Sequence, residues 1–135
     1  MATARNPARP LSPHLQVWKW GPHMLVSILH RVTGSGMATV GTAVLVWWLA
    51  AAASGPAAYA YFLSWFTGIW APLGYLLGVG LTWAFFQHLA NGVRHLFMDM
   101  GANFELKGNK TSSMATIVFA LAATIALWAY IVGAR

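Results

Sequence analysis

Two short stretches place ionisable side chains in otherwise apolar surroundings, and the first is SILHRVTG at residues 27–34. Its polar and small residues, Ser27, His30, Arg31 and Gly34, stand at i, i+3, i+4 and i+7. That is the spacing of one helix face. A hydroxyl, an imidazole and a permanent cation at the edge of an apolar helix are costly, so they are candidates for a functional site.

The second stretch is HLANGVRHLFMD at residues 88–99. Here His88, Gly92, His95 and Asp99 stand at i, i+4, i+7 and i+11, again on one helix face. A neutral histidine in an apolar helix is a good axial ligand for haem iron. Gly92 leaves room beside the helix for a flat group. The alternative is that His88 is only hydrogen-bonded inside a helix bundle.

Two charged residues of this stretch also have simpler interpretations. Arg94 points about 120° away from the His88 face at 3.6 residues per turn, so its guanidinium can extend to phosphate headgroups. Asp99 can be a helix-end residue at the membrane interface. Asp99 and Glu105 are the only acidic residues and cysteine is absent. These counts argue against self-contained hydrolytic chemistry, a disulfide, a thiolate metal site or an iron–sulfur cluster.

The composition predicts that membrane helices position these residues. Apolar residues make up 59% of the chain and charged residues 7%, against roughly 25% charged residues in soluble domains. Three apolar stretches, at about 24–53, 62–97 and 113–133, are long enough to cross a bilayer, which takes about 20 helical residues. We therefore predict one all-α integral membrane domain over residues 1–135, with loops near 54–59 and 99–113. Small residues at helical spacing predict close helix approach on the first two spans: Gly34, Ala38 and Gly41, then Gly74 and Gly78.

The basic residues predict the orientation of the three spans. Only Arg135 lies on the opposite side from the others, which are Arg5, Arg9, Lys19, Arg31, Arg94, Lys107 and Lys110. The positive-inside rule then places the N-terminus and the second loop in the cytoplasm or the mitochondrial matrix. On that side we expect a short surface helix from Ser12-Pro13 and interfacial anchors at Trp18, Lys19 and Trp20. The net charge of +6 is spread along the chain without a nucleic-acid motif, so nucleic acid is not an expected partner.

This topology brings the two polar stretches to one depth. The first span leaves the inner side and the second returns to it, so the start of one lies level with the end of the other. His88 is then the deepest ionisable residue of the second span, about 10 Å inward from His95 at 1.5 Å per residue. Haem propionates placed above it would need cations, and His30, Arg31 and His95 lie in that layer. The chain offers no clear second ligand on another span, so a six-coordinate haem would need a histidine from a partner.

In these motifs the chain resembles the large membrane-anchor (cytochrome b556) subunits of succinate:quinone oxidoreductase, the succinate dehydrogenase of respiratory complex II. The resemblance rests on RPLSPHLQVW (9–18), SILHRVTG and HLANGVRHLFMD, and the three-span layout covers nearly the whole chain. It implies that His88 binds haem b, with the second axial histidine from the small anchor subunit. It also implies that Ser27 and Arg31 line a ubiquinone site and that His30 and Arg31 lie near the propionates. His95 is a weaker propionate candidate, and Asp99 a candidate for proton uptake.

The resemblance also implies the partners and the location. The partners are the small anchor, iron–sulfur and flavoprotein subunits and membrane lipid, in a bacterial inner membrane or, in a eukaryote, the mitochondrial inner membrane. The electrons must come from other subunits, so the chain is not an enzyme alone and contributes to the quinone site of one. In that site Arg31 can stabilise negative charge on the quinone oxygens and Ser27 can donate a hydrogen bond.

Two other functions remain open from the sequence. One is a haem-free anchor of the same assembly. The other is a small proton-relay subunit using His88, His95 and Asp99. The relay is disfavoured because nothing ionisable occupies the outer half of any predicted span.

Overall fold

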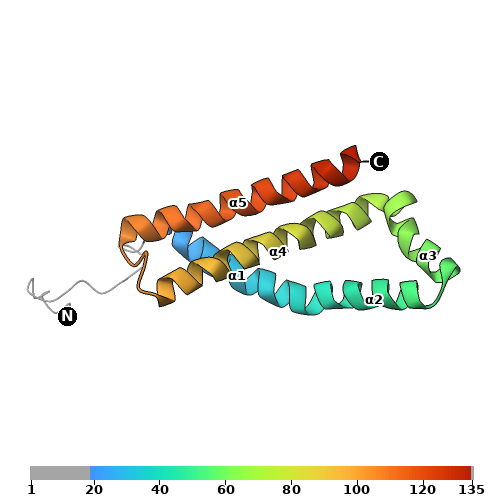
Figure 1. The fold of residues 1–135 in the computed structure, drawn as a ribbon, viewed down its shortest axis with the longest axis horizontal. Helices are drawn as coiled ribbons and strands as arrows, with labels where there is room; N and C mark the ends of the chain where they lie inside the picture. Colours follow the sequence, from blue (N-terminus) through green and yellow to red (C-terminus); the bar gives the residue numbers. More distant parts are fainter. Residues whose placement is uncertain (1–18, 135) are drawn as a thin grey trace, which may run out of the picture.

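The computed structural model describes residues 19–134, and these residues form a bundle of helices (Figure 1). In chain order the elements are α1 (Pro22–Gly36), the π-helical segment η1 (Met37–Gly41), α2 (Thr42–Ala53), α3 (Pro56–Thr67), α4 (Ala71–Asp99) and α5 (Leu106–Gly133). The elements α1, η1 and α2 follow one another without a gap and form one continuous helical segment, Pro22–Ala53. The predicted all-α class is therefore confirmed. The predicted surface helix at Ser12-Pro13 and the anchor Trp18 lie outside the described residues.

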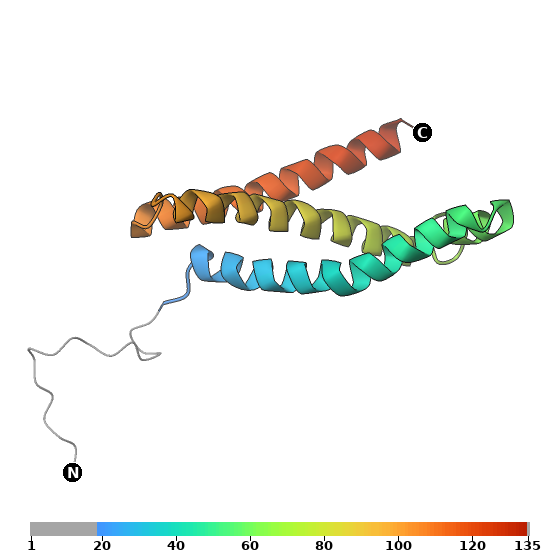
Figure 2. The ribbon, with the colours of Figure 1, turned by 60° about the horizontal axis from the view of Figure 1, so that its bottom comes forward.

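Three of the helical stretches are long and apolar enough to cross a membrane: Pro22–Ala53, Ala71–Asp99 and Leu106–Gly133. Their mean hydropathies are 1.6, 1.2 and 2.2, in that order. Figures 1 and 2 both show that the start of α1, the end of α4 and the start of α5 gather at one end of the bundle. The two polar stretches of the sequence therefore lie at the same end, as the topology predicts.

The predicted second span is wrong in its first part. Residues 62–97 do not form one helix, because α3 ends at Thr67 and α4 begins at Ala71. Gly68 has an extended backbone (φ −96°, ψ −157°) that ends α3, and a proline stands in the first turn of α4. Proline is favoured there because its missing N–H is not needed by the helix. The predicted loop at 54–59 shrinks to Ser54 and Gly55, since Pro56 already begins α3.

The other boundaries also shift outward. The first membrane-spanning segment begins at Pro22 rather than near residue 24, and α5 begins at Leu106 rather than near residue 113. The opening turns of α5, LKGNKTSS, are polar. Hydropathy marks only the apolar part of a helix. The helix α5 begins before that part, with a polar N-terminal extension.

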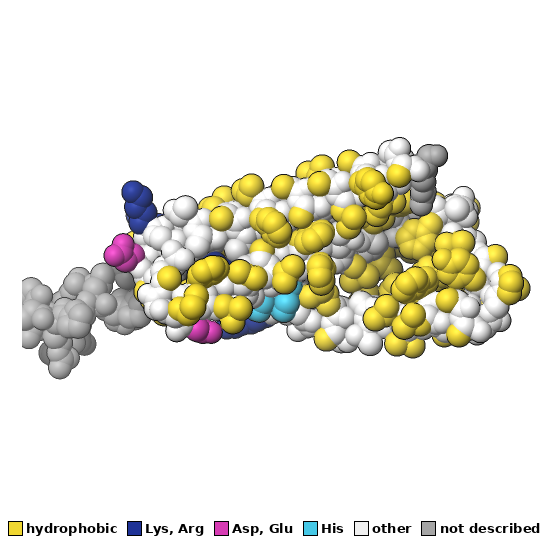
Figure 3. All heavy atoms as spheres, viewed as in Figure 1, with side chains coloured by type: hydrophobic (Ala, Val, Ile, Leu, Met, Phe, Trp, Pro, Cys, Tyr) yellow, Lys and Arg dark blue, Asp and Glu magenta, His cyan; other side chains and the backbone are white. Residues whose placement is uncertain are grey.

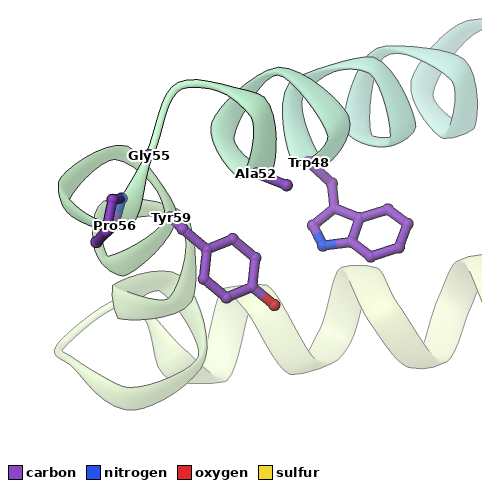
Figure 4. Close-up of a pocket in the computed structure, with 5 residues that line it drawn as sticks. All are labelled: Trp48, Ala52, Gly55, Pro56 and Tyr59. Carbon is purple, nitrogen blue, oxygen red and sulfur yellow. The ribbon is translucent and has the colours of Figure 1, made fainter.

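Aromatic rings pack the end of the bundle that α3 closes. Trp47 lies edge-on to Phe62 and Trp65, with ring centroids 4.8 and 5.6 Å apart. The first glycine of α4, Gly74, lies against the backbone carbonyl of Trp65, and Gly78 lies against the ring of Trp128 on α5. Both glycines of the predicted small-residue stripe thus allow close helix approach. At the same end, a pocket of about 450 Å³ between α2 and α3 is lined by Trp48, Ala52, Gly55, Pro56 and Tyr59 (Figure 4).

Within the described chain the buried positions are more often polar than apolar. The buried apolar residues are Val26, Ala51, Phe62 and Ala120, whereas the buried polar ones are Thr33, Gln87, Asn91, Arg94, Ser113, Thr116 and Thr124. Long apolar side chains instead cover the outer surface, which Figure 3 shows over most of one face. This distribution suits a bundle in lipid, where packing and interhelical hydrogen bonds rather than water exclusion hold helices together.

Candidate functional site

α1 and α4 approach each other closely at Gly34, which lies against His88. A Cβ at Gly34 would lie 2.8 Å from Cε1 of the His88 ring and 3.3 Å from its Nδ1. Those distances are shorter than ordinary carbon contacts, so only glycine fits there without moving the ring. The small residue that ends the SILHRVTG face thus makes room for the histidine that begins the HLANGVRHLFMD face.

The hydrogen bonds of His88 define which of its nitrogens carries the proton. Its Nδ1 lies 3.1 Å from the backbone oxygen of His30 and 3.3 Å from the hydroxyl oxygen of Thr33. The backbone oxygen can only accept, and the Thr33 hydroxyl donates its own hydrogen to the backbone oxygen of Leu29 at 2.7 Å. Nδ1 of His88 must therefore be the donor. In the neutral ring Nε2 is then left with its lone pair.

Two further histidines complete a cluster of three, which we call the histidine cluster (His30, His88 and His95). The rings of His30 and His88 are stacked, with centroids 3.8 Å apart and planes within 6°. The ring of His95 is tilted by 50° with its centroid 5.1 Å from that of His30. Its Nδ1 donates to the backbone oxygen of Asn91 at 2.8 Å. Both faces predicted from spacing therefore meet. The described residues nevertheless contain no group of three or more side chains arranged to hold a free metal ion.

The remaining predicted site residues lie outside the histidine cluster. Ser27, Arg31 and Asp99 are exposed, and no hydrogen bond or ion pair ties them to another described residue. In Figure 3 the charged side chains visible on this face lie toward the end of the bundle where α4 meets α5, and the histidines lie between that end and the middle. A side chain at Gly92 would meet nothing within 4 Å, which agrees with the space expected beside that residue. Ser27, Arg31 and Gly92 therefore present open surface next to the cluster.

A second polar group, which the sequence reading missed, joins α4 to α5. This polar seam consists of Gln87, Asn91 and Arg94 on α4 and Asn109, Ser112, Ser113 and Thr116 on α5. Its three α4 members stand at i, i+4 and i+7. This spacing on one helix face, like that of the histidines, was the sequence pattern that could have predicted the seam.

The expected reach of Arg94 to headgroups is wrong, because this side chain belongs to the polar seam. It is only 7% exposed. Its guanidinium donates to Ser112 at 3.1 Å, to Asn109 at 2.6 Å and to the side-chain oxygen of Asn91 at 3.3 Å. Arg94 therefore holds the end of α4 against the start of α5.

Comparisons with known proteins agree with this arrangement. Residues 5–127 match the family model described as succinate dehydrogenase/fumarate reductase transmembrane subunit. The chain is 39% identical to the succinate dehydrogenase cytochrome b556 subunit of Paracoccus denitrificans over 117 residues, which is 87% of each chain. It is 32% identical to the subunit of the same name from Rickettsia felis over 120 residues, 89% of this chain and 90% of that one. It is also 33% identical to the mouse mitochondrial cytochrome b560 subunit over 84% of this chain and 66% of that one.

Proposed function

The chain belongs to the family of succinate dehydrogenase/fumarate reductase transmembrane subunits, and from this premise we propose that it binds haem b through His88 and forms part of a ubiquinone site. It is a multi-pass membrane anchor of succinate dehydrogenase in a bacterial or mitochondrial inner membrane. The name cytochrome b556 belongs to its relatives. For this chain the haem and quinone roles rest on its own residues.

The observation that carries the haem proposal is the hydrogen bond from Nδ1 of His88 to the His30 carbonyl. Histidines that bind metal usually donate their second ring N–H to a carbonyl or carboxylate, which fixes the tautomer and raises the basicity of the ligating nitrogen. His88 has this arrangement, and the residue is only partly buried. The residues present therefore fit a haem whose iron takes Nε2 of His88.

The surroundings of His88 fit the rest of the group. Open space beside Gly92 suits a flat macrocycle. His30, Arg31 and His95 would supply hydrogen-bond donors or positive charge to its two propionates. When bound, haem b supplies a one-electron carrier. We assign the second histidine for the iron to the small anchor subunit of the complex.

For quinone reduction we assign Ser27 and Arg31 of α1. Both are exposed and engage no other described residue, so both are available to a quinone and to a partner subunit that covers it. Arg31 would stabilise negative charge on the quinone oxygens, and Ser27 would donate a hydrogen bond. Asp99, exposed at the end of α4, is the candidate for proton uptake. Electrons would arrive from the flavoprotein through the iron–sulfur subunit, because this chain has no cysteine for a cluster.

These assignments imply one orientation. The end of the bundle that holds the histidine cluster also holds Lys107 and Lys110 at the start of α5. By the positive-inside rule that end faces the cytoplasm or the matrix. The iron–sulfur and flavoprotein subunits would then dock on the same side as Ser27 and Arg31.

The experiment that tests the haem proposal is a reduced-minus-oxidised difference spectrum of the complex purified with this chain. We expect the bands of a b-type haem, at one haem per flavoprotein subunit. A complex that oxidises succinate but shows no haem bands would identify the chain as a haem-free anchor and overturn the proposal.

A glycine substitution tests the α1–α4 contact that positions His88. We expect Gly34→Ala to lower haem content, because the added Cβ displaces the His88 ring. Gly36→Ala on the same helix is the matched control, since its Cβ would meet nothing within 4 Å. Alanine is favoured over glycine in a helix by about 1 kcal/mol, so the control should be neutral or stabilised. Equal haem in the two variants, measured by pyridine haemochrome, would contradict the role given to Gly34.

A further inference from the structure

Two amide side chains in the polar seam each keep one atom without a partner. Gln87 and Asn91 are both 0% exposed, and neither Oε1 of Gln87 nor Nδ2 of Asn91 has a hydrogen-bond partner in the described chain. A buried polar atom left unpaired costs free energy of the order of 1–3 kcal/mol, and bulk water cannot relieve it inside a membrane span. A hydrogen-bond partner for these two atoms would therefore stabilise the bundle.

The orientation of the Gln87 amide follows from its neighbour on α5. Its amide lies 3.4 Å from the hydroxyl oxygen of Thr116. That hydroxyl already donates its single hydrogen to the backbone oxygen of Ser113 at 2.8 Å. It can therefore only accept from Gln87. The NH₂ group must face Thr116, and the amide oxygen is left as an unpaired acceptor.

The orientation of the Asn91 amide follows from Arg94. The amide faces Nη1 of the guanidinium at 3.3 Å, and a guanidinium carries donors only. The oxygen of Asn91 must therefore face Arg94, and its NH₂ group is left as an unpaired donor. One turn of α4 thus presents an unpaired acceptor and an unpaired donor, at positions whose Cβ atoms lie roughly 5–6 Å apart in a helix.

We propose that an internal water molecule binds between Gln87 and Asn91, accepting from Nδ2 of Asn91 and donating to Oε1 of Gln87. A water is the smallest group that does both, and buried waters typically bridge polar groups of this kind. A partner subunit cannot supply the missing groups from outside, because both residues are already covered by this chain alone.

The water would complete one hydrogen-bonded chain along the seam. It would run from Thr116 through Gln87, the water, Asn91 and Arg94 to Asn109 and Ser112. Each α4 member of the seam precedes a residue of the histidine face: Gln87 precedes His88, Asn91 precedes Gly92 and Arg94 precedes His95. A complete seam would therefore fix the rotation of α4. The inference concerns the α4–α5 interface and does not depend on haem or quinone binding.

The direct test is a density map of the assembled complex at a resolution that shows ordered waters. We expect a peak within hydrogen-bond distance of both Oε1 of Gln87 and Nδ2 of Asn91. A direct contact between the two amides, or a side-chain or lipid atom in the place of the peak, would overturn the proposal.

A variant gives an independent readout. Gln87→Met keeps the length of the side chain but removes both the acceptor for the water and the NH₂ group that donates to Thr116. Thr116→Val is the matched control, because it breaks the same bond between Gln87 and Thr116 and leaves the Gln87 acceptor in place. We expect the midpoint of thermal unfolding of the complex to fall by about 2 °C or more further in Gln87→Met than in Thr116→Val. An equal or smaller fall in Gln87→Met would count against the proposal, because removal of the Gln87 acceptor would then have no cost of its own.

Discussion

Replacing His88 by alanine should remove haem b from the assembled complex. The imidazole is the ligand that we propose for the iron, with Nδ1 held 3.1 Å from the His30 carbonyl and Nε2 free. Loss of an outer partner of a metal-bound histidine costs about 10- to 100-fold in affinity, and loss of the ligand itself should cost no less. We expect haem per flavin, measured by pyridine haemochrome, to fall by about tenfold or more.

The matched control for that variant is His23→Ala, which removes a histidine from the start of α1, outside the histidine cluster. It should keep its haem. Assembly is checked separately by succinate oxidation with a soluble dye, which needs the flavoprotein but not the haem. Full haem content in His88→Ala would show that the iron is held elsewhere. Complete loss of dye reduction would instead show that the variant complex does not assemble.

The sequence predicted the meeting of the two polar faces because only periodicity and topology were needed. Ser27, His30, Arg31 and Gly34 share one face by spacing, and antiparallel spans bring that face level with His88 and His95. The contact of Gly34 with His88 confirms that the two faces meet. The tautomer of His88 could not be predicted in the same way, because the atom that fixes it is a backbone oxygen of His30. Every residue has a backbone oxygen, so the sequence does not show which one accepts the hydrogen bond of His88.

The break between α3 and α4 was missed for a different reason. Residues 62–86 are apolar except for Ser64, Thr67 and Thr82. Hydropathy shows that such a segment suits a lipid environment, but it does not show where the helix axis changes direction. The local signals were Gly68 and Pro72, four residues apart. Either is tolerated inside a membrane helix when neighbouring helices satisfy the backbone. Only their combination with the close approach of Gly74 to Trp65 shows that the chain folds back there.

The position of Arg94 shows that this bundle distributes polar and apolar side chains differently from a soluble protein. In water an arginine at the end of an apolar helix would place its charge outside the fold. Here it is 7% exposed and bound by three side chains, while long apolar side chains face outward. Polar residues at helical spacing within a span therefore indicate an interhelical interface, and α4 carries two such stripes. One forms the polar seam with α5 and the other forms the histidine cluster with α1.

The second large effect is expected at Arg31. We predict that Arg31→Leu lowers succinate:ubiquinone reductase activity by about 10- to 100-fold. Removing one preorganised donor from an enclosed site costs about 10²- to 10³-fold, and the lower range applies because Arg31 is exposed in this chain until partners cover it. Succinate oxidation with a soluble dye should survive, because it bypasses the quinone. Arg31→Lys should lie between the two, since an ammonium keeps the charge but not the planar fork of donors.

Lys110→Leu is the matched control for charge, because it removes one exposed cation from the same end of the bundle. If Arg31 acts only through the general positive potential of that end, the two leucine variants should lose quinone reduction alike. If Arg31 only supports assembly, dye reduction should fall with quinone reduction. A selective loss of quinone reduction in Arg31→Leu, with haem content preserved, would place the positive charge of α1 at the quinone itself. It would also separate the quinone role of Arg31 from its role beside the propionates, because the propionate role alone should change haem content or potential first.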